Sequence, residues 1–183
     1  MIWFFTPYDK EKKLINAINR YFDLVKFDDD WVVIMDGDTA FLNADFGDII
    51  ERYTKKYADT GMFTCYASRC HYKIQVPEGV NMFSDSILYH KTIATRQAVI
   101  GRNQVLEINR KIAGHLMVIR KGVWDRIKDE VFSKARGKNI LGIDSKISYA
   151  VLEAGLTIRL MKELYIFHYC RLSEGFDYDE HLK

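Results

Sequence analysis

The architecture of this chain is best predicted from one segment, Trp31-Val32-Val33-Ile34-Met35-Asp36-Gly37-Asp38. Its first five residues form a short apolar run rich in β-branched side chains. Such a run is typical of a strand that is buried on both faces, as in a parallel sheet. Parallel sheets bind their ligands just beyond the carboxyl ends of their strands. Carboxylates at that position suit Mg²⁺ or Mn²⁺, which prefer oxygen ligands and often bridge to substrate phosphates. The segment therefore predicts a metal-assisted site for a phosphorylated substrate.

The two carboxylates of this segment have different predicted roles. Asp38 is the better candidate for a cation ligand, whereas Asp36 could bind the metal or a sugar hydroxyl. A structural alternative is a tight turn in which both carboxylates accept hydrogen bonds from backbone amides. We favour the functional interpretation, because two charged side chains one residue apart contribute little to packing at the end of a buried strand.

Length and composition predict a soluble globular protein with one domain spanning residues 1–183. A net charge of +2 is too small to indicate nucleic-acid binding by bulk electrostatics. No apolar run has the length of a transmembrane helix, and residues 1–7 lack the basic head and the length of a signal peptide. Cys65, Cys70 and Cys170 follow no metal-finger spacing, so we interpret them as reduced thiols of a cytoplasmic protein.

Alternating strand and helix patterns predict an α/β fold with a mixed sheet. Asp28-Asp29-Asp30 is interpreted as a solvated turn. The long, poorly periodic segment from residue 67 to residue 100 is of the kind that often carries function. It contains Asp85 and His90, which are weak candidates for contacts to an acceptor substrate. Residues 173–183 are expected to form a loosely held tail. Strands are predicted at residues 2–5, 31–35, 62–66, 115–119, 157–160 and 164–168, and helices at residues 9–27, from 44–46 onward, 85–99, 122–131 and 144–154.

Three residues near the carboxyl terminus are further candidates for chemistry. Asp144 is a good N-cap, which is usually a structural role, but it could also present a carboxylate at a cleft rim and act as a general base. His168 follows an apolar strand and shares an edge with Asp38 if the two strands are parallel. Its imidazole would suit Mn²⁺ better than Mg²⁺. Arg171 could reach a phosphate, although a surface ion pair is an equal alternative.

In this order, these segments resemble the GT-A glycosyltransferases, specifically the family 2-like transferases that use nucleotide-diphospho-sugars. Residues 31–41 are similar to the family's strand and DxD motif, and residues 114–124 to the strand and helix start that follow its acceptor loop. Gly142-Ile143-Asp144-Ser145-Lys146 resembles the segment that holds the catalytic base of inverting members. Residues 154–171 resemble the closing segment that ends in a metal-binding His. The resemblance covers most of the chain from about residue 12 onward.

The resemblance implies a GT-A-like fold, with a mixed, mainly parallel sheet flanked by helices. It also implies a divalent cation, Mn²⁺ or Mg²⁺, held against a diphosphate by Asp38 and His168, with Asp36 as a further ligand or a contact to the ribose or donor sugar. Asp144 would deprotonate an acceptor hydroxyl, and transfer would invert the sugar carbon. A UDP-sugar is the favoured donor. The acceptor would be a saccharide or a lipid-linked saccharide, which could bring the protein to a membrane surface.

The chain departs from the family pattern in two places. Only one strand and one helix precede its DxD motif, so the nucleotide-binding half is reduced. Either Thr6-Pro7-Tyr8 and its neighbours form a smaller nucleotide pocket, with Thr6 and Pro7 as contacts, or donor binding is weak or lost. Ile143 also replaces the Glu that usually precedes the base.

Two other classes compete with the transferase interpretation. Haloacid-dehalogenase-like phosphohydrolases also place a DxD after an apolar strand, but they need Thr or Val two places after the second Asp, where this chain has Ala40. The second alternative is not an enzyme. It is a nucleotide-sugar-binding module, or a degenerate transferase that acts as a partner subunit, and it is motivated by the short N-terminal half.

Overall fold

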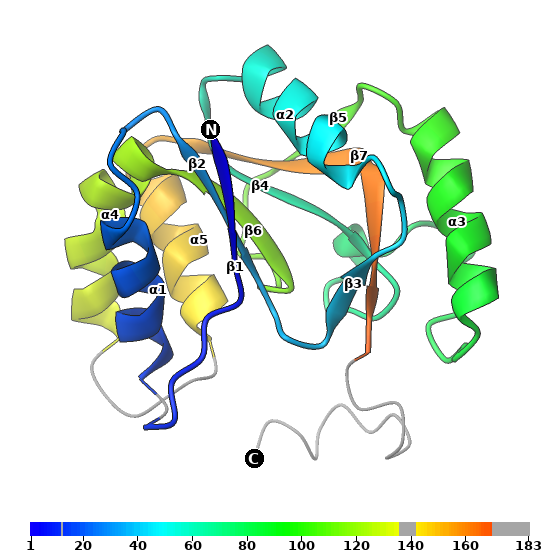
Figure 1. The fold of residues 1–183 in the computed structure, drawn as a ribbon, viewed down its shortest axis with the longest axis horizontal. Coiled ribbons are helices and arrows are strands. Elements are labelled where there is room, and N and C mark those ends of the chain that lie inside the picture. Colours follow the sequence, from blue (N-terminus) through cyan, green and yellow to red (C-terminus); the bar gives the residue numbers. More distant parts are fainter. Residues whose placement is uncertain (12, 136–141, 170–183) are drawn as a thin grey trace.

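The computed structural model describes residues 1–11, 13–135 and 142–169, which form an α/β fold around one mixed, seven-stranded sheet (Figure 1). A short 3₁₀ turn, Lys73–Gln75, follows the fourth strand. The strands are β1 (Ile2–Phe5), β2 (Trp31–Met35), β3 (Thr39–Phe41), β4 (Thr60–Ala67), β5 (Val105–Ile108), β6 (Leu116–Arg120) and β7 (Thr157–His168), and the helices are α1 (Leu14–Asp23), α2 (Phe46–Lys56), α3 (Ile87–Ile100), α4 (Lys121–Lys134) and α5 (Ile143–Glu153).

The sheet has the strand order β1-β2-β6-β4-β7-β3, and β5 also pairs with β7. Among the described residues, β1–β2 and β4–β7 are parallel pairs, whereas β2–β6, β4–β6, β3–β7 and β5–β7 are antiparallel. The prediction of a mixed sheet is confirmed, but the prediction of a mainly parallel one is wrong. The reason is that β6 runs against both of its neighbours in the centre, and two short strands run against β7 at its outer edge.

The segment from Thr157 to His168 forms one long strand and not the two short strands that were predicted. Its inner edge pairs with β4 before and after a register shift that falls between the pairs Cys65–Met161 and Tyr66–Tyr165. Its outer edge is shared, because β5 pairs with its first part and β3 with its last part. Neither β3 nor β5 was predicted. This long strand runs from the core to the end of the sheet at which β2 also ends.

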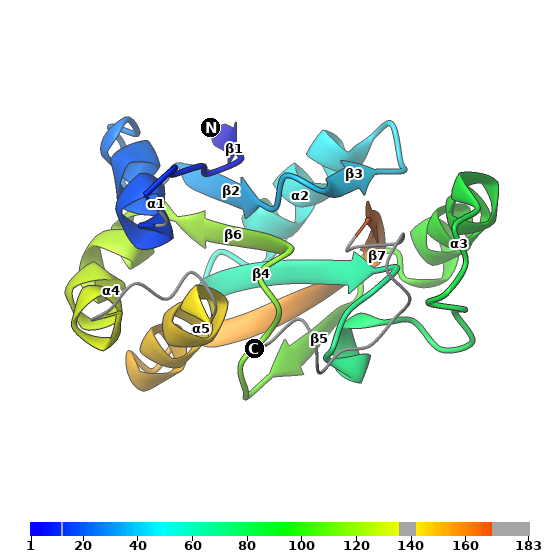
Figure 2. The ribbon, with the colours of Figure 1, turned by 90° about the horizontal axis from the view of Figure 1, so that it is seen from below.

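Helices cover both faces of the sheet (Figures 1 and 2). On one face, α1, α4 and α5 pack on Val32, Ile34 and Ile119, and on the other face α2 packs on Val33 and Val118. Alternate residues of β2 therefore face opposite layers, which confirms the prediction that this strand is buried on both sides. Helix α3 lies beside the end of β7, where Ile93 and Ala94 contact Tyr165.

The ends of several elements differ from the predicted ones. The first helix begins only at Leu14, because the Asp9 carboxylate accepts hydrogen bonds from the amides of Glu11 and Lys13 and holds a turn there. Asp30 is buried and not part of a solvated turn, since its carboxylate accepts a hydrogen bond from the Trp3 indole.

The last helix, α5, begins at Ile143 after Gly142, which has a φ of 85°. Asp144 therefore lies in the first helical turn and is not the N-cap, which corrects the prediction. Gly155, with a φ of 72°, does end this helix as expected. Among the described residues, no helix is long and apolar enough to cross a membrane.

Gly101 packs tightly against the backbone of β7 at the point where β7 changes register. A Cβ on Gly101 would lie 2.3 Å from the Lys162 carbonyl oxygen, which is backbone and cannot move aside cheaply. We expect Gly101→Ala to lower the free energy of unfolding by about 3 kcal/mol, because overpacking forces the backbone apart. Urea unfolding followed by circular dichroism measures this loss. The matched control is Gly47→Ala in α2, where an added Cβ has no neighbour within 4 Å; an equal loss in both variants would contradict the prediction.

Candidate metal centre

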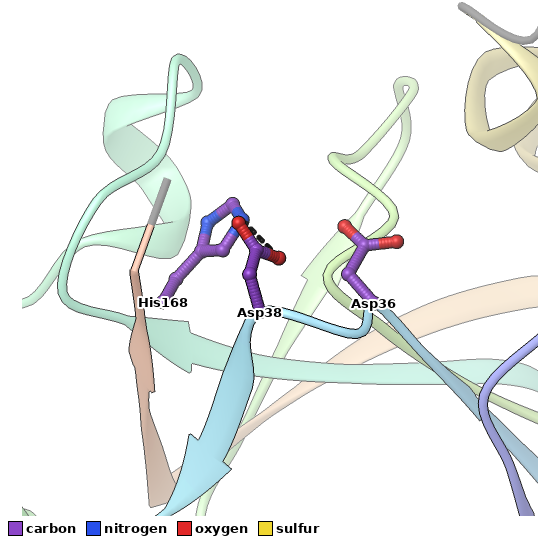
Figure 3. Close-up of side chains that lie close together, drawn as sticks. All are labelled: Asp36, Asp38 and His168. Carbon is purple, nitrogen blue, oxygen red and sulfur yellow. Dashed lines mark ion pairs between the residues drawn. The ribbon is translucent and has the colours of Figure 1, made fainter. Parts of the chain in front are cut away.

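Three side chains of the types that bind metal ions meet at one edge of the sheet (Figure 3). Asp36 follows β2, Asp38 precedes β3, and His168 is the last residue of β7. One ligand atom from each of the three lies within 4.8 Å of the other two. Two carboxylate oxygens and one imidazole nitrogen form a donor set that suits a hard or borderline divalent cation. The structure thus brings together all three residues that were predicted as metal ligands.

The backbone explains why these residues meet. Strands β2 and β7 run in the same direction, although β6 and β4 separate them, so both end at the same edge. The short strand β3 then pairs with the end of β7, which places Thr39 opposite His168. The Tyr169 amide donates a hydrogen bond to the Asp38 carbonyl (2.8 Å) and locks this pairing. The prediction that His168 shares an edge with Asp38 is confirmed, and β3 supplies the contact.

The turn between the two aspartates leaves their carboxylates pointing outward (Figure 3). Thr39 closes it, since its hydroxyl donates to the Asp36 carbonyl at 2.7 Å and its amide donates to the same oxygen at 3.3 Å. The Asp36 amide donates to the His115 carbonyl at 3.3 Å. These hydrogen bonds close the turn through backbone and hydroxyl groups, so they do not require the carboxylates that the structural alternative had used as caps.

The ring of His168 is oriented for metal binding. Its Nδ1 lies 2.9 Å from the Arg69 carbonyl, which can only accept, so Nδ1 carries the proton of the neutral ring. Its Nε2 lies 3.4 Å from the Asp38 carboxylate and is the nitrogen that remains available as a ligand. Metal-binding histidines usually donate their other N–H to a carbonyl or carboxylate in this way. The orientation of His168 therefore exists before any cation binds.

The loop behind His168 is held by charge. The Arg69 guanidinium, only 2% exposed, pairs with the Asp85 carboxylate at 2.6 Å and donates to the Met82 carbonyl at 2.7 Å. His90 is also buried, and its Nδ1 and Nε2 lie 2.7 Å from the Tyr165 hydroxyl and 2.9 Å from the Ser84 carbonyl. Asp85 and His90, predicted as weak candidates for acceptor contacts, therefore support the loops around the site.

Burial and the charges of neighbouring residues shift the pKa values of His168 and Asp36. Burial lowers the pKa of His168, but the hydrogen bond and charge of Asp38 outweigh burial and leave the pKa above its ordinary value. The pKa of Asp36 is raised, first by removal of water around the carboxylate and then by the charges of Asp38 and Asp144, with His168 opposing. Asp36 as a whole remains exposed, so a ligand can reach it. A divalent cation would relieve the repulsion between these carboxylates.

His115 was missed as part of the site, because its sequence position indicated only the start of a strand. It is fully buried, and its ring centroid lies 5.8 Å from that of His168. Its Nε2 donates to the Cys65 carbonyl (3.2 Å), while its Nδ1 is buried with no hydrogen-bond partner among the described residues. Desolvation, with the nearby His168 charge, lowers the pKa of His115 to about 3. His115 is thus a buried, uncharged side chain that lies next to His168 of the cluster.

This buried histidine predicts a loss of stability in acid. In the unfolded chain the imidazole takes up a proton at the ordinary histidine pKa of 6.5, whereas in the native state its pKa is about 3, so stability falls as the pH drops below 6.5. Between about pH 7.5 and pH 5 the loss is about 2 kcal/mol. The raised pKa values of Asp36, Asp144 and His168 act in the opposite direction, so the contribution of His115 is isolated by comparing the pH dependence of the wild-type protein with that of His115→Gln. Urea titrations in a chelator that show the same pH slope for both proteins would contradict this assignment.

A pocket of about 240 Å³ adjoins the cluster. Asp36 and Asp144 both line it, so the candidate ligand and the candidate base share one cavity. Pro7 lies at the same pocket, and the Thr6 methyl would lie 3.5 Å from a Cβ on Gly37. Both residues predicted as nucleotide contacts therefore lie at or beside the pocket. Its remaining lining is largely apolar: Leu14, Ile18, Ile34, Met35, Gly114, Met117, Gly142 and Ile143.

Asp144 is held close to the start of β6. A Cβ on Gly114 would lie 2.9 Å from the Asp144 Cβ, so only glycine permits this approach. The Asp144 Oδ1 accepts a hydrogen bond from the Ser145 amide at 2.7 Å. Burial raises the pKa of Asp144, while the amides of Ser145 and Gly114 and the charge of Lys111 partly offset the increase. A carboxylate with a raised pKa is better suited to accept a proton than an ordinary one.

Two predictions fall on residues 170–183, which lie outside the described residues. They concern Arg171 as a phosphate contact and the tail at residues 173–183. No known family model matches the chain, and no curated protein matches its sequence. Any functional assignment therefore depends on the chemistry of the site.

Proposed function

We propose that this protein is a metal-dependent glycosyltransferase of the GT-A type, which transfers a sugar from a nucleotide-diphospho-sugar to an acceptor hydroxyl with inversion. The observation that carries the proposal is the pairing of two features. A preoriented carboxylate–carboxylate–imidazole cluster lies at the sheet edge, and a separate half-buried carboxylate, Asp144, lies across an adjoining pocket. A metal centre for the leaving group and a distinct base for the nucleophile are the two parts that such a transfer needs.

The cluster fits a divalent cation. Asp36, Asp38 and His168 Nε2 would hold Mn²⁺ or Mg²⁺, and the imidazole favours Mn²⁺. When bound, the ion would act as a Lewis acid that neutralises the charge of the departing nucleoside diphosphate. The hydrogen bond from His168 Nδ1 to the Arg69 carbonyl keeps the ligand nitrogen aimed at the cluster.

The donor would bind over the ends of β1 and β2. Thr6 and Pro7 would contact its nucleoside, and Asp36, which belongs to the cluster and also lines the pocket, could accept hydrogen bonds from ribose or sugar hydroxyls. The apolar lining from Leu14, Ile18 and Met117 suits the flat face of a base or ring and not the diphosphate. We favour a UDP-sugar as the donor.

The acceptor would approach Asp144. Its carboxylate would take the hydroxyl proton as the hydroxyl oxygen forms a bond to the anomeric carbon. The bond from that carbon to the diphosphate oxygen breaks, and its electron pair leaves with the nucleoside diphosphate. Because attack and departure occur on opposite faces, the configuration inverts. We propose a saccharide or lipid-linked saccharide as the acceptor and the cytoplasm as the location.

Calorimetric titration with UDP and GDP, each with and without Mn²⁺, tests the donor site. We expect binding that requires Mn²⁺ and that is tighter for UDP. The free nucleotides, used as probes, carry the base, the ribose and the diphosphate but not the sugar that is transferred, so their binding reports the donor site alone. An absence of binding by either nucleotide, with or without the ion, would refute the proposed function.

A further inference from the structure

Helix α3 has apolar side chains on the face that turns away from the protein. Its inner face, with Ile93 and Ala94, packs against Tyr165 of β7. Leu88 and Val99 on its outer face are 76% and 73% exposed. In Figures 1 and 2 the helix stands at one extreme of the molecule, beyond the end of the sheet. An amphipathic surface helix normally turns such side chains inward, so this outer face is unusual.

The exposed residues form an ordered stripe. Leu88, Thr92, Thr95 and Val99 follow the spacing i, i+4, i+7 and i+11, which places them in one line along a helix. Lys91 and Arg96 flank the stripe on its two sides, and all six of these residues are exposed. Ile87 adds a further apolar side chain that is 47% exposed.

The charged residues of the helix itself have one sign. The sequence contains no Asp or Glu between Asp85 and Glu107, whereas Lys91, Arg96 and Arg102 lie in that interval. Arg96 donates one hydrogen bond to the Glu78 carbonyl (3.2 Å) and keeps further donors for other partners. A line of apolar and hydroxyl side chains with cations along both borders matches the boundary between lipid head groups and acyl chains, where phosphates lie above the hydrocarbon.

We propose that the outer face of α3, defined by Ile87, Leu88, Lys91, Thr92, Thr95, Arg96 and Val99, docks on the surface of an anionic lipid bilayer. The helix lies in the plane of the surface, with Leu88 and Val99 inserted and the two cations on lipid phosphates. The same face of a second copy would be a poor partner, because it would bring Lys91 and Arg96 against their like charges.

Docking would also orient the candidate metal centre. His90 of α3 hydrogen-bonds Tyr165, three residues before His168 on the same strand. The helix that contacts the lipid is therefore packed against the strand that ends in the cluster. This inference does not depend on the proposed chemistry, and it can fail or hold independently of it.

Co-sedimentation with lipid vesicles tests the proposal. We expect the full chain to bind vesicles of mixed phosphatidylcholine and phosphatidylglycerol and not vesicles of phosphatidylcholine alone. Leu88→Ser combined with Val99→Ser should lower the partition coefficient at least about tenfold, because two apolar side chains no longer insert. Lys91→Glu should lower it about tenfold, and added salt should weaken binding of the wild-type protein.

The matched control is Leu24→Ser combined with Phe27→Ser. These two apolar residues are 62% and 70% exposed and follow α1, the helix that lies on the opposite side of the molecule from α3 (Figure 1). Circular dichroism confirms that each variant is folded. The proposal is overturned if anionic vesicles bind no protein, or if the control pair loses as much binding as the α3 pair. It is also overturned if Lys91→Glu has no effect, or if size-exclusion chromatography shows that the α3 pair disrupts a dimer while vesicle binding is absent.

Discussion

Asp38→Ala is expected to weaken Mn²⁺-dependent UDP binding at least about 100-fold, since changes to the groups that merely support metal ligands already cost roughly 10- to 100-fold in metal affinity. Asp38 contributes a carboxylate that is 44% exposed and lies 3.4 Å from His168 Nε2. Removing it leaves one carboxylate and one imidazole, and the His168 ring loses the charge it faces. Calorimetry with UDP and Mn²⁺, compared with Mn²⁺ alone, separates the loss of the metal from the loss of the nucleotide.

The matched control for this variant is Asp48→Asn on α2. Asp48 is also an exposed carboxylate, but it does not belong to the cluster, so its loss should leave UDP binding unchanged. Equal weakening in both variants would point to a general effect of surface charge. Unchanged Mn²⁺-dependent binding in Asp38→Ala would show that the metal centre lies elsewhere, and the role assigned to the three ligands would be wrong.

The part of this site that could be predicted from the sequence is the part that depends on local pattern. The apolar run before Asp36 predicted a buried strand, and a carboxylate after such a strand must lie at a sheet edge. His168 after a second apolar run could be placed at that edge by the same argument. The structure confirms both placements, because β2 and β7 end together.

The part that could not be predicted depends on contacts between distant segments. Strand β3 has only three residues, too few for a periodic pattern, and it forms because Thr39 pairs with His168 across the sheet. The two apolar runs of β7 were interpreted as separate strands. Lys162 and Glu163 lie between them, yet Glu163 is buried and pairs with Arg52 at 2.5 Å. His115 carried no signal at all, since only its place beneath His168 makes it part of the site.

Asp144→Asn is expected to reduce turnover about 1000-fold while leaving Mn²⁺-dependent UDP binding within about twofold, because general-base catalysis contributes roughly 100- to 10,000-fold. The substitution keeps the shape of the side chain beside Gly114 and removes only the charge that accepts a proton. In the wild-type protein, the rate should rise with pH through the raised pKa of Asp144, as the deprotonated fraction increases. Release of nucleoside diphosphate from a UDP-sugar, with a panel of hydroxyl acceptors, provides the assay.

The metal cluster and Asp144 are separate groups. This separation determines both the control for Asp144→Asn and how a negative result is interpreted. Asp129→Asn, an exposed carboxylate on α4 that does not line the pocket, should leave turnover unchanged. If Asp144→Asn transfers sugar as fast as the wild-type protein, Asp144 is not the base. If the wild-type protein binds UDP with Mn²⁺ but transfers no sugar to any acceptor, the chain is a binding module, because the metal centre does not itself require the base across the pocket. Of the cluster, only Asp36 lines the cavity, where it follows β2, whereas Asp144 lines the cavity from α5, so a chain can keep the first function without the second.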